Sequence, residues 1–325
     1  MSKQVTIKQI AQYAGVSEAT VSRVLNQPEL VSKQTIQKVK DGMDELQYRP
    51  SALAQSMRNH TTKTIGVVIS NVLNPFFTTL VRGIEDAATK RGYSVIVCNT
   101  DENPDKEQRY INMLVDHQAD GIILASTGNH ANYHSMVNDM PLVFIDRMPQ
   151  GKDANLYDTV LVDNEKGSFN AVDALIKQGA TRVNAIVSPV ATTGTERLNG
   201  FRKALTAHDF PIREQDIALD DYLGQHTAEL ALNLIQTNQC DALFCGNNVI
   251  LMNVLKVLKE WQIGDMKLAV FDDQPWFDFV QYPIISVDQP AYLIGTKAFI
   301  TLMDRLANPD RPVTHDIVRT KLVIR

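Results

Sequence analysis

The stretch VTIKQIAQYAGVSEATVSRVLN, residues 5–26, predicts two short helices joined by a glycine turn. Thr6 lies three residues before Gln9, which is the spacing of a capping box at the start of a helix. Apolar side chains then recur at helical intervals on one face, at Ile7, Ile10, Ala11 and Ala14. Gly15 favours the left-handed backbone that ends many helices. The pattern therefore predicts a helix with one buried face, followed by a tight turn.

A second helix is predicted to begin after Ser17, whose hydroxyl can cap it. Its buried side would consist of Val21, Val24 and Leu25, and its exposed side of Glu18, Ala19, Ser22, Arg23 and Asn26. An arginine fork can bind guanine, a carboxylate can accept from cytosine, and hydroxyl or amide groups can reach phosphate oxygens. The exposed side is therefore suited to a DNA groove, where small Ala19 permits close approach to the base edges.

A third helix fits residues 32–47, with Ser32 as its cap and Pro50 as its stop. Its inward-facing side chains would be Ile36, Val39, Met43 and Leu46. Three helices are enough for a helix-turn-helix module, in which the second helix enters the major groove. The competing interpretation of the bare pattern is a helical hairpin packed inside an enzyme.

The segment YRPSALAQSMR, residues 48–58, decides between these interpretations. After Pro50, Ser51 can cap a further short helix, and small residues surround Met57. This continuation closely resembles the hinge of the lactose-repressor/galactose-repressor family of bacterial transcriptional regulators. The enzyme hairpin is accordingly disfavoured.

The resemblance covers the whole chain. Its landmarks, in family order, are TIKQIAQYAGVSEATVSRVLN, VSKQT, YRPSALAQSM, IGVVISNVLNPFF, DGIILAS, VFIDR, ERLNGF, VFDD and ISVDQP. The resemblance implies a DNA-binding headpiece, a hinge helix that folds on operator DNA, and a two-lobed core like a periplasmic sugar-binding protein. The residues expected at DNA are Thr6, Ser17, Glu18, Ala19, Thr20, Ser22, Arg23, Asn26, Ser32, Thr35, Ala54 and Met57. Met57 stands where the family usually carries leucine, and we expect it to wedge into the minor groove.

Charge is divided unevenly along the chain. Residues 1–60 hold eight Lys or Arg against five Asp or Glu, a net charge of +3, so the remaining residues carry −8 to give the total of −5. A basic head on an acidic body suits nucleic-acid contact at one end. No stretch approaches the roughly 18 apolar residues of a membrane helix, and the N-terminal residues lack an apolar leader, so we expect a cytoplasmic protein with no membrane partner.

The 325 residues are too many for one small domain. Cys98, Cys240 and Cys245 lie in apolar runs, and no His or Cys companions stand near the latter two. We therefore expect reduced, buried thiols, with neither a metal site nor a cofactor.

From Thr64 onward, short β-branched runs alternate with helical patterns, which predicts a doubly wound α/β core. The strands of the first set are IGVVIS, SVIVC, GIILAS and PLVFID, and those of the second are RVNAIVSP, DIALDD, ALFCGN and LAVFDD. Helices are expected near 76–91, 105–118, 195–209, 226–236 and 249–262. The predicted fold is thus an all-α helix-turn-helix headpiece plus an α/β core of two doubly wound parallel-sheet lobes.

The predicted domains are a headpiece at 1–48, a hinge helix and linker at 49–61, and an effector-binding and dimerisation core at 62–325. By the family resemblance, the chain crosses between the lobes near Val162, near Pro290 and again near the C-terminus. Lobe one would comprise about 62–161 plus 291–320, and lobe two about 162–290 plus the C-terminal end.

Ligands bind such sheets in the crevice outside the carboxyl ends of the strands. The residues expected to bind an effector there are Phe76, Arg147, Asn164, Arg197, Asn247, Asp272 and Trp276. Asp, Asn and Arg groups suit the adjacent hydroxyls of a sugar, and Trp276 opposite Phe76 or Phe77 could supply a stacking face. By resemblance, Arg197, Asn247 and Asp272 align with positions that commonly bind ligand in the family.

Three of these assignments have alternatives. Arg147 and Arg197 favour a sugar acid or sugar phosphate over a neutral sugar, but either arginine could instead be neutralised in an ion pair, such as one between the lobes. Trp276 could pack as a lid residue without touching ligand.

The sequence therefore predicts a homodimeric, operator-binding transcriptional regulator that responds to a carbohydrate-type ligand and is not an enzyme. A repressor of carbohydrate uptake or catabolism genes, relieved by an inducer, is favoured, and an activator or corepressor-dependent repressor remains open. No P-loop, nucleophile elbow or H-E-x-x-H motif occurs in the sequence. A sugar-binding transport protein is the competing class, and the headpiece argues against it. The final run KLVIR carries no leucine-heptad helix, which favours a dimer over a tetramer.

Overall fold

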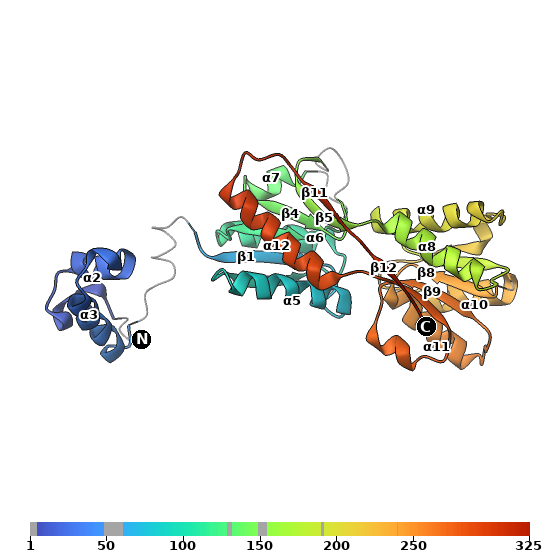
Figure 1. The fold of residues 1–325 in the computed structure, drawn as a ribbon, viewed down its shortest axis with the longest axis horizontal. Coiled ribbons are helices and arrows are strands. Elements are labelled where there is room, and N and C mark those ends of the chain that lie inside the picture. The colour runs from blue at the N-terminus through green and yellow to red at the C-terminus, as the bar shows by residue number, and fades with distance from the viewer. Residues whose placement is uncertain (1–4, 49–60, 129–131, 149–154, 190–191, 239) are drawn as a thin grey trace. The chain divides into compact units, whose positions relative to one another are not determined.

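The computed structural model describes residues 5–48, 61–128, 132–148, 155–189, 192–238 and 240–325. The chain divides into two compact units, Met1–Thr62 and Lys63–Arg325 (Figure 1). The hinge helix expected after Pro50 lies outside the described residues. Within those ranges, no helix combines the length and the apolarity needed to cross a membrane.

The first unit has the helices α1 (Ile7–Ala14), α2 (Glu18–Asn26) and α3 (Lys33–Glu45), with a 3-10 turn η1 (Pro28–Leu30) before α3. Thr6 and Gln9 form the predicted capping box, and Gly15 adopts a φ of +66° at the end of α1. The buried side chains at the centre are Ile10, Ala11, Ala14, Val21, Val24 and Val39. The helix-turn-helix prediction is confirmed, including its turn and its caps.

The third helix ends earlier than the sequence predicts. It stops at Glu45, and Gln47 takes a left-handed φ of +52°. This turn brings the N–H of Tyr48 to within 2.8 Å of the carbonyl oxygen of Met43, where it donates a hydrogen bond. A local left-handed turn, and not Pro50, therefore ends α3.

The core unit is built on two six-stranded sheets, one in each lobe. The first sheet has the order β11-β5-β4-β3-β1-β2 and consists of β1 (Thr64–Ile69), β2 (Ser94–Asn99), β3 (Gly121–Leu124), β4 (Leu142–Ile145), β5 (Asp158–Val162) and β11 (His315–Val318). The second has the order β12-β10-β9-β8-β6-β7 and consists of β6 (Val183–Val187), β7 (Ile217–Leu219), β8 (Ala242–Cys245), β9 (Lys267–Phe271), β10 (Ile284–Asp288) and β12 (Lys321–Ile324). The two orders correspond strand for strand, which confirms two doubly wound lobes.

One edge strand departs from the predicted parallel arrangement. β12 pairs antiparallel with β10, whereas every other described strand pair is parallel. β11 runs toward the junction of the lobes, and the chain continues into β12 without a helix between them (Figure 1). β12 therefore runs away from the junction, whereas its neighbour β10 runs toward it. A parallel β12 would need a longer crossover connection.

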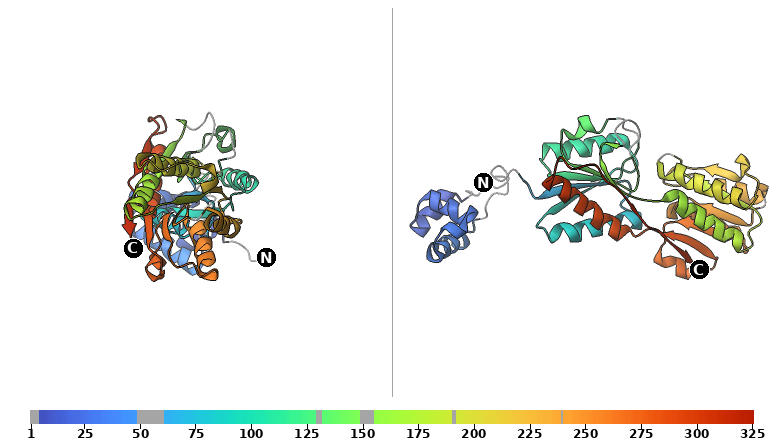
Figure 2. Two further views of the ribbon diagram at one scale, coloured as in Figure 1. Left: turned by 90° about the vertical axis from the view of Figure 1, so that its right-hand side faces the viewer. Right: turned by 45° about the horizontal axis from the view of Figure 1, so that its top comes forward.

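Helices cover both faces of each sheet (Figures 1 and 2). In lobe one, α5 (Pro75–Thr89) and α12 (Ala291–Ala307) lie on one face, and α6 (Pro104–Asp116) and α7 (His134–Val137) on the other. In lobe two, α8 (Asn164–Lys177) and α9 (Thr192–Ala207) lie on one face, and α10 (Thr227–Asn238) and α11 (Asn248–Glu260) on the other. Two 3-10 turns, η3 (Glu214–Asp216) and η4 (Pro275–Phe279), complete lobe two. Burial on both faces explains the continuous apolar runs of the strands.

α5 and α12 pack with their backbones in contact. A Cβ atom at Gly83 would lie 2.2 Å from the carbonyl oxygen of Tyr292, and one at Gly295 would lie 2.0 Å from that of Leu80. Only glycine permits this approach without a shift of the helices. The contact holds the middle of α5 against the first turns of α12, next to the chain crossing between β10 and α12.

Candidate functional site

α2 presents a polar face to solvent. Glu18, Ala19, Arg23 and Asn26 are exposed on it, and Ser22 is half-buried. The guanidinium of Arg23 forms no ion pair with any residue that the structure describes. Its five N–H donors are therefore available to a guanine edge or a phosphate.

Three hydroxyls expected at DNA serve as helix caps. The hydroxyl oxygens of Thr6, Ser17 and Ser32 accept the backbone N–H groups of Gln9, Thr20 and Thr35 at 3.4, 3.1 and 3.2 Å. The hydroxyls of Thr20 and Thr35 lie 2.9 Å from those of Ser17 and Ser32. These groups thus stand at the helix N-termini, where backbone dipoles favour a phosphate.

Asn26 turns back onto its own helix. Its side-chain N–H₂ donates to the carbonyl oxygen of Ser22 at 2.5 Å and lies 3.2 Å from the Ser22 hydroxyl. A phosphate contact by Asn26 would require its amide to leave these bonds. Ala54 and Met57 lie outside the described residues, so the hinge contact and the minor-groove wedge stay predictions.

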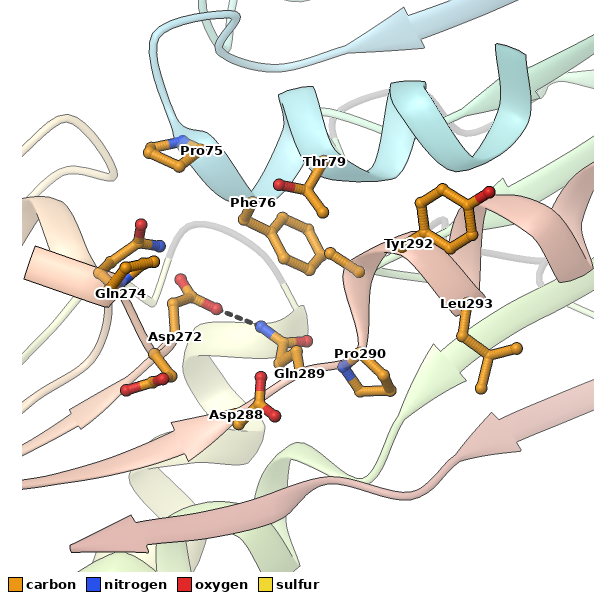
Figure 3. A pocket seen from close by; sticks show the side chains of 13 residues that line it. Pro75, Phe76, Thr79, Asp272, Gln274, Asp288, Gln289, Pro290, Tyr292 and Leu293 are labelled. Atoms are coloured by element: carbon orange, nitrogen blue, oxygen red, sulfur yellow. Dashed lines mark hydrogen bonds between the residues drawn. The ribbon is translucent and has the colours of Figure 1, made fainter. Parts of the chain in front are cut away.

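A cavity of about 530 Å³ lies where the two lobes meet, and we call it the first cavity. Its lining consists of Pro75, Phe76, Thr79, Asp272, Asp273, Gln274, Pro275, Asp288, Gln289, Pro290, Ala291, Tyr292 and Leu293. Figure 3 shows Phe76 of α5 on one side and Asp272 with Gln289 on the other. Two of the predicted effector residues, Phe76 and Asp272, therefore line one cavity.

Asp272 follows β9 and is almost fully buried, with a left-handed φ of +78°. Its carboxylate accepts a hydrogen bond from the side-chain N–H₂ of Gln289 (Figure 3) and one from the backbone N–H of Asn248. Burial raises the pKa of Asp272, although Arg197 and these hydrogen bonds act in the opposite direction. The carboxylate is a preorganised acceptor that needs ligand donors to replace its lost water.

A second cavity, of about 340 Å³, contains two other predicted residues, Arg147 and Asn164. Its remaining lining residues are Asp146, Met148, Leu161, Val162, Asp163, Glu165, Thr192, Glu196 and Ile317. The N–H₂ of Asn164 donates to the Glu196 carboxylate at 2.9 Å, and burial raises the pKa of Glu196. The predicted residues are thus divided between two cavities at the lobe junction.

Arg147 is neutralised within lobe one. Its two terminal nitrogens donate to the Glu102 carboxylate at 2.9 and 3.1 Å, and its Nε donates to Asp146 at 3.1 Å. Burial alone would lower the pKa of Arg147, but the two carboxylates outweigh burial and raise it. The ring of Tyr222, from lobe two, lies 4.7 Å from the guanidinium carbon. Of the alternatives for this arginine, the ion pair is found, within one lobe and not between lobes.

Arg197 is held by neutral acceptors. Its Nε donates to the side-chain oxygen of Asn164 at 2.9 Å, and one terminal nitrogen donates to the carbonyl oxygen of Gly246 at 2.8 Å. The guanidinium lies over the ring of Phe271 at 3.8 Å, within the electrostatic reach of Asp272. Arg197 therefore lies between the two cavities: it binds Asn164 of the second and interacts electrostatically with Asp272 of the first.

Three predicted residues line neither cavity: Arg197, Asn247 and Trp276. Asn247 caps α11 by accepting the N–H of Ile250 at 2.8 Å, and its N–H₂ donates to the carbonyl oxygen of Tyr222 at 3.3 Å. Trp276 packs edge-on against Phe277 at 4.6 Å between ring centroids, beside the lobe-two core. Trp276 thus takes the packing position that was its alternative, and the aromatic side chains that line the first cavity are Phe76 and Tyr292.

Sequence reasoning missed four residues at the junction, Asn248, Gln289, Glu102 and Tyr222, whereas Asn74 is among the polar residues that it places just past strand ends. The N–H₂ of Asn248 donates to the side-chain oxygen of Asn74 at 2.9 Å, which joins the two lobes. Gln289 follows the strand run ISVD, and this position past a strand end was the available signal for it. Glu102 and Tyr222 lie in loops whose sequence carries no comparable pattern.

Two family models match the chain. Residues 6–51 match the bacterial regulatory proteins of the lacI family, and residues 62–317 match the periplasmic binding proteins and sugar binding domain of the LacI family. The core match alone covers more than half of the chain.

Curated relatives match over nearly the full length. The probable HTH-type transcriptional regulator EndR of Paenibacillus polymyxa is 34% identical, with 98% of this chain and 96% of that protein covered. The HTH-type transcriptional repressor PurR of Vibrio parahaemolyticus is 30% identical, with 98% and 97% covered.

Solved structures agree in fold. A complex of the transcriptional regulator CelR with cellobiose matches with a TM-score of 0.73 and 26% identity, over 99% of both chains. The lac repressor dimer bound to operator and the anti-inducer ONPF matches with a TM-score of 0.83 and 22% identity, over 99% of this chain and 98% of that one. With both domains matched in order, this chain belongs to the lacI family of bacterial regulatory proteins, which are DNA-binding transcriptional regulators.

Proposed function

We propose that this regulator binds operator DNA through the exposed face of α2 and changes its DNA affinity when a carbohydrate-type effector binds at the lobe junction. The main support is that one chain combines two features. Its capped helix-turn-helix exposes Arg23 without an ion pair to any described residue, and its core has buried polar groups around cavities between the two lobes. Among the relatives, the CelR structure contains cellobiose, which supports a sugar as the ligand class.

In the headpiece, Arg23 and Glu18 would set operator preference. Arg23 offers a fork to guanine, whereas a carboxylate at Glu18 is repelled by phosphates unless it accepts from cytosine. Glu18 should therefore contribute selectivity more than affinity. The caps Ser17 and Ser32 would fix the position of the headpiece along the DNA duplex by binding phosphates at the helix N-termini.

In the core, Asp272, Gln289 and Arg197 would bind the effector from lobe two and the adjacent crossing, with Phe76 facing them from lobe one. A ligand that contacts both lobes binds the closed arrangement better than the open one. Its differential affinity can then shift the equilibrium between a DNA-binding and a released state. Release by an inducer is the simplest form of this coupling.

A homodimer suits this function because operators with two half-sites require two headpieces. Exposed apolar residues of lobe one support it: Leu73 and Val72 are 86% and 45% exposed, and Val97 on the edge strand β2 is 43% exposed. The backbone N–H of Val72 donates to the Asn99 side chain at 2.7 Å, which ties this loop to the end of β2. A second copy would cover this apolar surface.

The test begins with duplexes selected from a random pool by the full-length protein, followed by anisotropy titrations with and without sugars that raise its melting temperature. We expect a palindromic site and a sugar-dependent change of affinity of about 5- to 150-fold. Binding of all duplexes with equal affinity would contradict the proposal, as would operator binding that no stabilising sugar alters.

A further inference from the structure

We propose that Glu102 is a specificity-determining residue: by neutralising Arg147, it makes the lobe junction select uncharged, polyhydroxylated effectors over sugar phosphates and sugar acids. The inference rests on the proposed function, since it names the effector class of that same site. It also reverses the preference for an anionic ligand that the two arginines suggest in the sequence.

The geometry of Arg147 removes it as an anion receptor. All three of its nitrogens donate to carboxylate oxygens, of Glu102 and Asp146, at 2.9 to 3.1 Å. The side chain is 1% exposed, and that of Glu102 is 13% exposed. A bidentate guanidinium–carboxylate pair already satisfies the fork that would hold a phosphate. A ligand anion would have to displace Glu102 from this pair.

Arg197 is no better suited than Arg147 to bind a ligand anion, because acidic side chains lie near it too. Two of its nitrogens are bound to Asn164 and to the carbonyl oxygen of Gly246, and its remaining positive charge faces Asp272. Glu196, which receives a hydrogen bond from Asn164, also lies within its electrostatic reach. The charge of Arg197 is therefore offset by two acidic neighbours.

The cavity walls repel anions further. The first cavity is lined by the carboxylates of Asp272, Asp273 and Asp288 and by no described Lys or Arg, although Arg325 pairs with Asp273 from outside the lining. The second is lined by Asp146, Asp163, Glu165 and Glu196 and by Arg147; Arg147 pairs with Asp146 and Lys203 pairs with Glu165, which leaves Asp163 and Glu196 without an ion pair among the described residues. A phosphate would add about 1.5 to 2 negative charges to this buried, acidic surface. Coulomb repulsion at reduced dielectric would oppose its binding.

The unsatisfied polar atoms at the junction are neutral carboxamide groups. Within the described part of the chain, the buried atoms without a hydrogen-bond partner include Gln289 Oε1, Asn248 Oδ1 and Asn74 Nδ2. These are two acceptors and one donor, on residues that are at most 7% exposed. A hydroxyl group can donate to such an acceptor and accept from such a donor, whereas a phosphate oxygen only accepts. The unpaired atoms thus match a polyol better than an anion.

The first experiment is titration calorimetry of the full-length protein with matched pairs, each a neutral sugar and its phosphate. The probes are cellobiose, glucose with glucose 6-phosphate, and fructose with fructose 1-phosphate, extended to other pairs for any sugar found by thermal shift. We expect the neutral member to bind at least about tenfold more tightly than its phosphate. A phosphate or sugar acid that binds as tightly as its neutral parent would overturn the inference and leave the proposed function intact.

The second experiment uses Glu102→Gln, which frees half of the Arg147 ion pair. We expect this variant to gain at least about tenfold in affinity for the phosphorylated member of the pair. Glu102→Asp keeps the charge, and Asp101→Asn removes a neighbouring charge that pairs with Lys106 and not with Arg147. Neither control should gain phosphate affinity. Thermal melts of all three variants verify that the core is folded.

Two outcomes would remove the assignment to Glu102. An unchanged preference in folded Glu102→Gln would show that Glu102 does not set specificity, and an equal gain in Asp101→Asn would reduce the effect to general surface charge. If neither member of any pair binds while operator binding persists, the carbohydrate part of the proposed function fails, and this inference fails with it.

Discussion

Arg23 of the headpiece and Arg147 of the core carry the same guanidinium group in opposite surroundings. Arg23 is exposed and forms no ion pair with any described residue, whereas Arg147 is buried and each of its nitrogens donates to a carboxylate. An exposed arginine gives up little to bind a phosphate or a guanine, while a buried pair must first be broken. The neighbouring side chains of an arginine, more than the residue type itself, therefore decide whether it can bind an anion.

The largest expected effect follows from removing Arg147. Arg147→Met leaves Glu102 and Asp146 as buried carboxylates without their cation, which should lower the free energy of unfolding by about 3 to 5 kcal/mol. Urea denaturation followed by core tryptophan fluorescence measures this change. The double variant Glu102→Gln/Arg147→Met should recover part of the loss. A single variant as stable as the wild type would mean that the ion pair is not buried in solution.

Removal of Arg23 should have a smaller effect, and on a different property. Arg23→Ala should weaken operator binding by roughly 1 to 3 kcal/mol if the fork meets guanine, with unfolding unchanged within about 0.5 kcal/mol. Anisotropy titrations on operator and random duplexes measure the difference. The exposed cation Lys38 provides a control, as Lys38→Ala should not relax specificity. Equal losses on both duplexes would reduce Arg23 to a phosphate contact.

The charge of Asp272 should give a pH-dependent effect on stability. Because burial raises the pKa of Asp272, its contribution to stability is present at low pH and is lost as pH rises through the raised pKa. Asp272→Asn avoids the buried charge, and Asn tolerates the left-handed backbone there. The variant should be more stable than the wild type at pH 7 and equal below about pH 4. Melts across this range would contradict the account if the difference did not change with pH.

The smallest expected effect concerns a helix cap. Ser17→Ala removes the oxygen that accepts the N–H of Thr20 and should destabilise the headpiece by about 1 kcal/mol, whereas Ser17→Gly should cost only a few tenths. Headpiece melting, followed by helical circular dichroism, separates the two. The core transition should stay constant. Equal destabilisation by both variants would argue against the capping bond.

The headpiece was predictable because its determinants are local. A capping box needs only Thr6 and Gln9, and the turn needs only Gly15. The end of α3 was predicted wrongly, because a left-handed turn at Gln47 has no strong sequence signal when Pro50 stands nearby. In the core, the alternation of strands and helices gave the two sheets, but not the antiparallel β12, whose direction depends on the crossing between lobes.

The junction was less predictable because its contacts are distant in sequence. Position past a strand end identified Asp272 and Arg147, but it could not show that Glu102 lies opposite Arg147, 45 residues away. The sequence also could not decide that Trp276 packs against the lobe-two core, since an aromatic residue near a strand end suits both packing and stacking. Burial and pairing, which decide the charge offered to a ligand, are tertiary properties.

The most direct test of the account is the operator affinity of the full-length protein, measured by anisotropy with no ligand, with the neutral sugar that stabilises it most, and with the phosphate of that sugar. The account predicts that the neutral sugar changes the dissociation constant by at least about fivefold. The phosphate at the same concentration should leave the dissociation constant unchanged, because Glu102 and Asp146 already bind the guanidinium of Arg147. A response to the phosphate equal to or larger than the response to the neutral sugar would contradict the account.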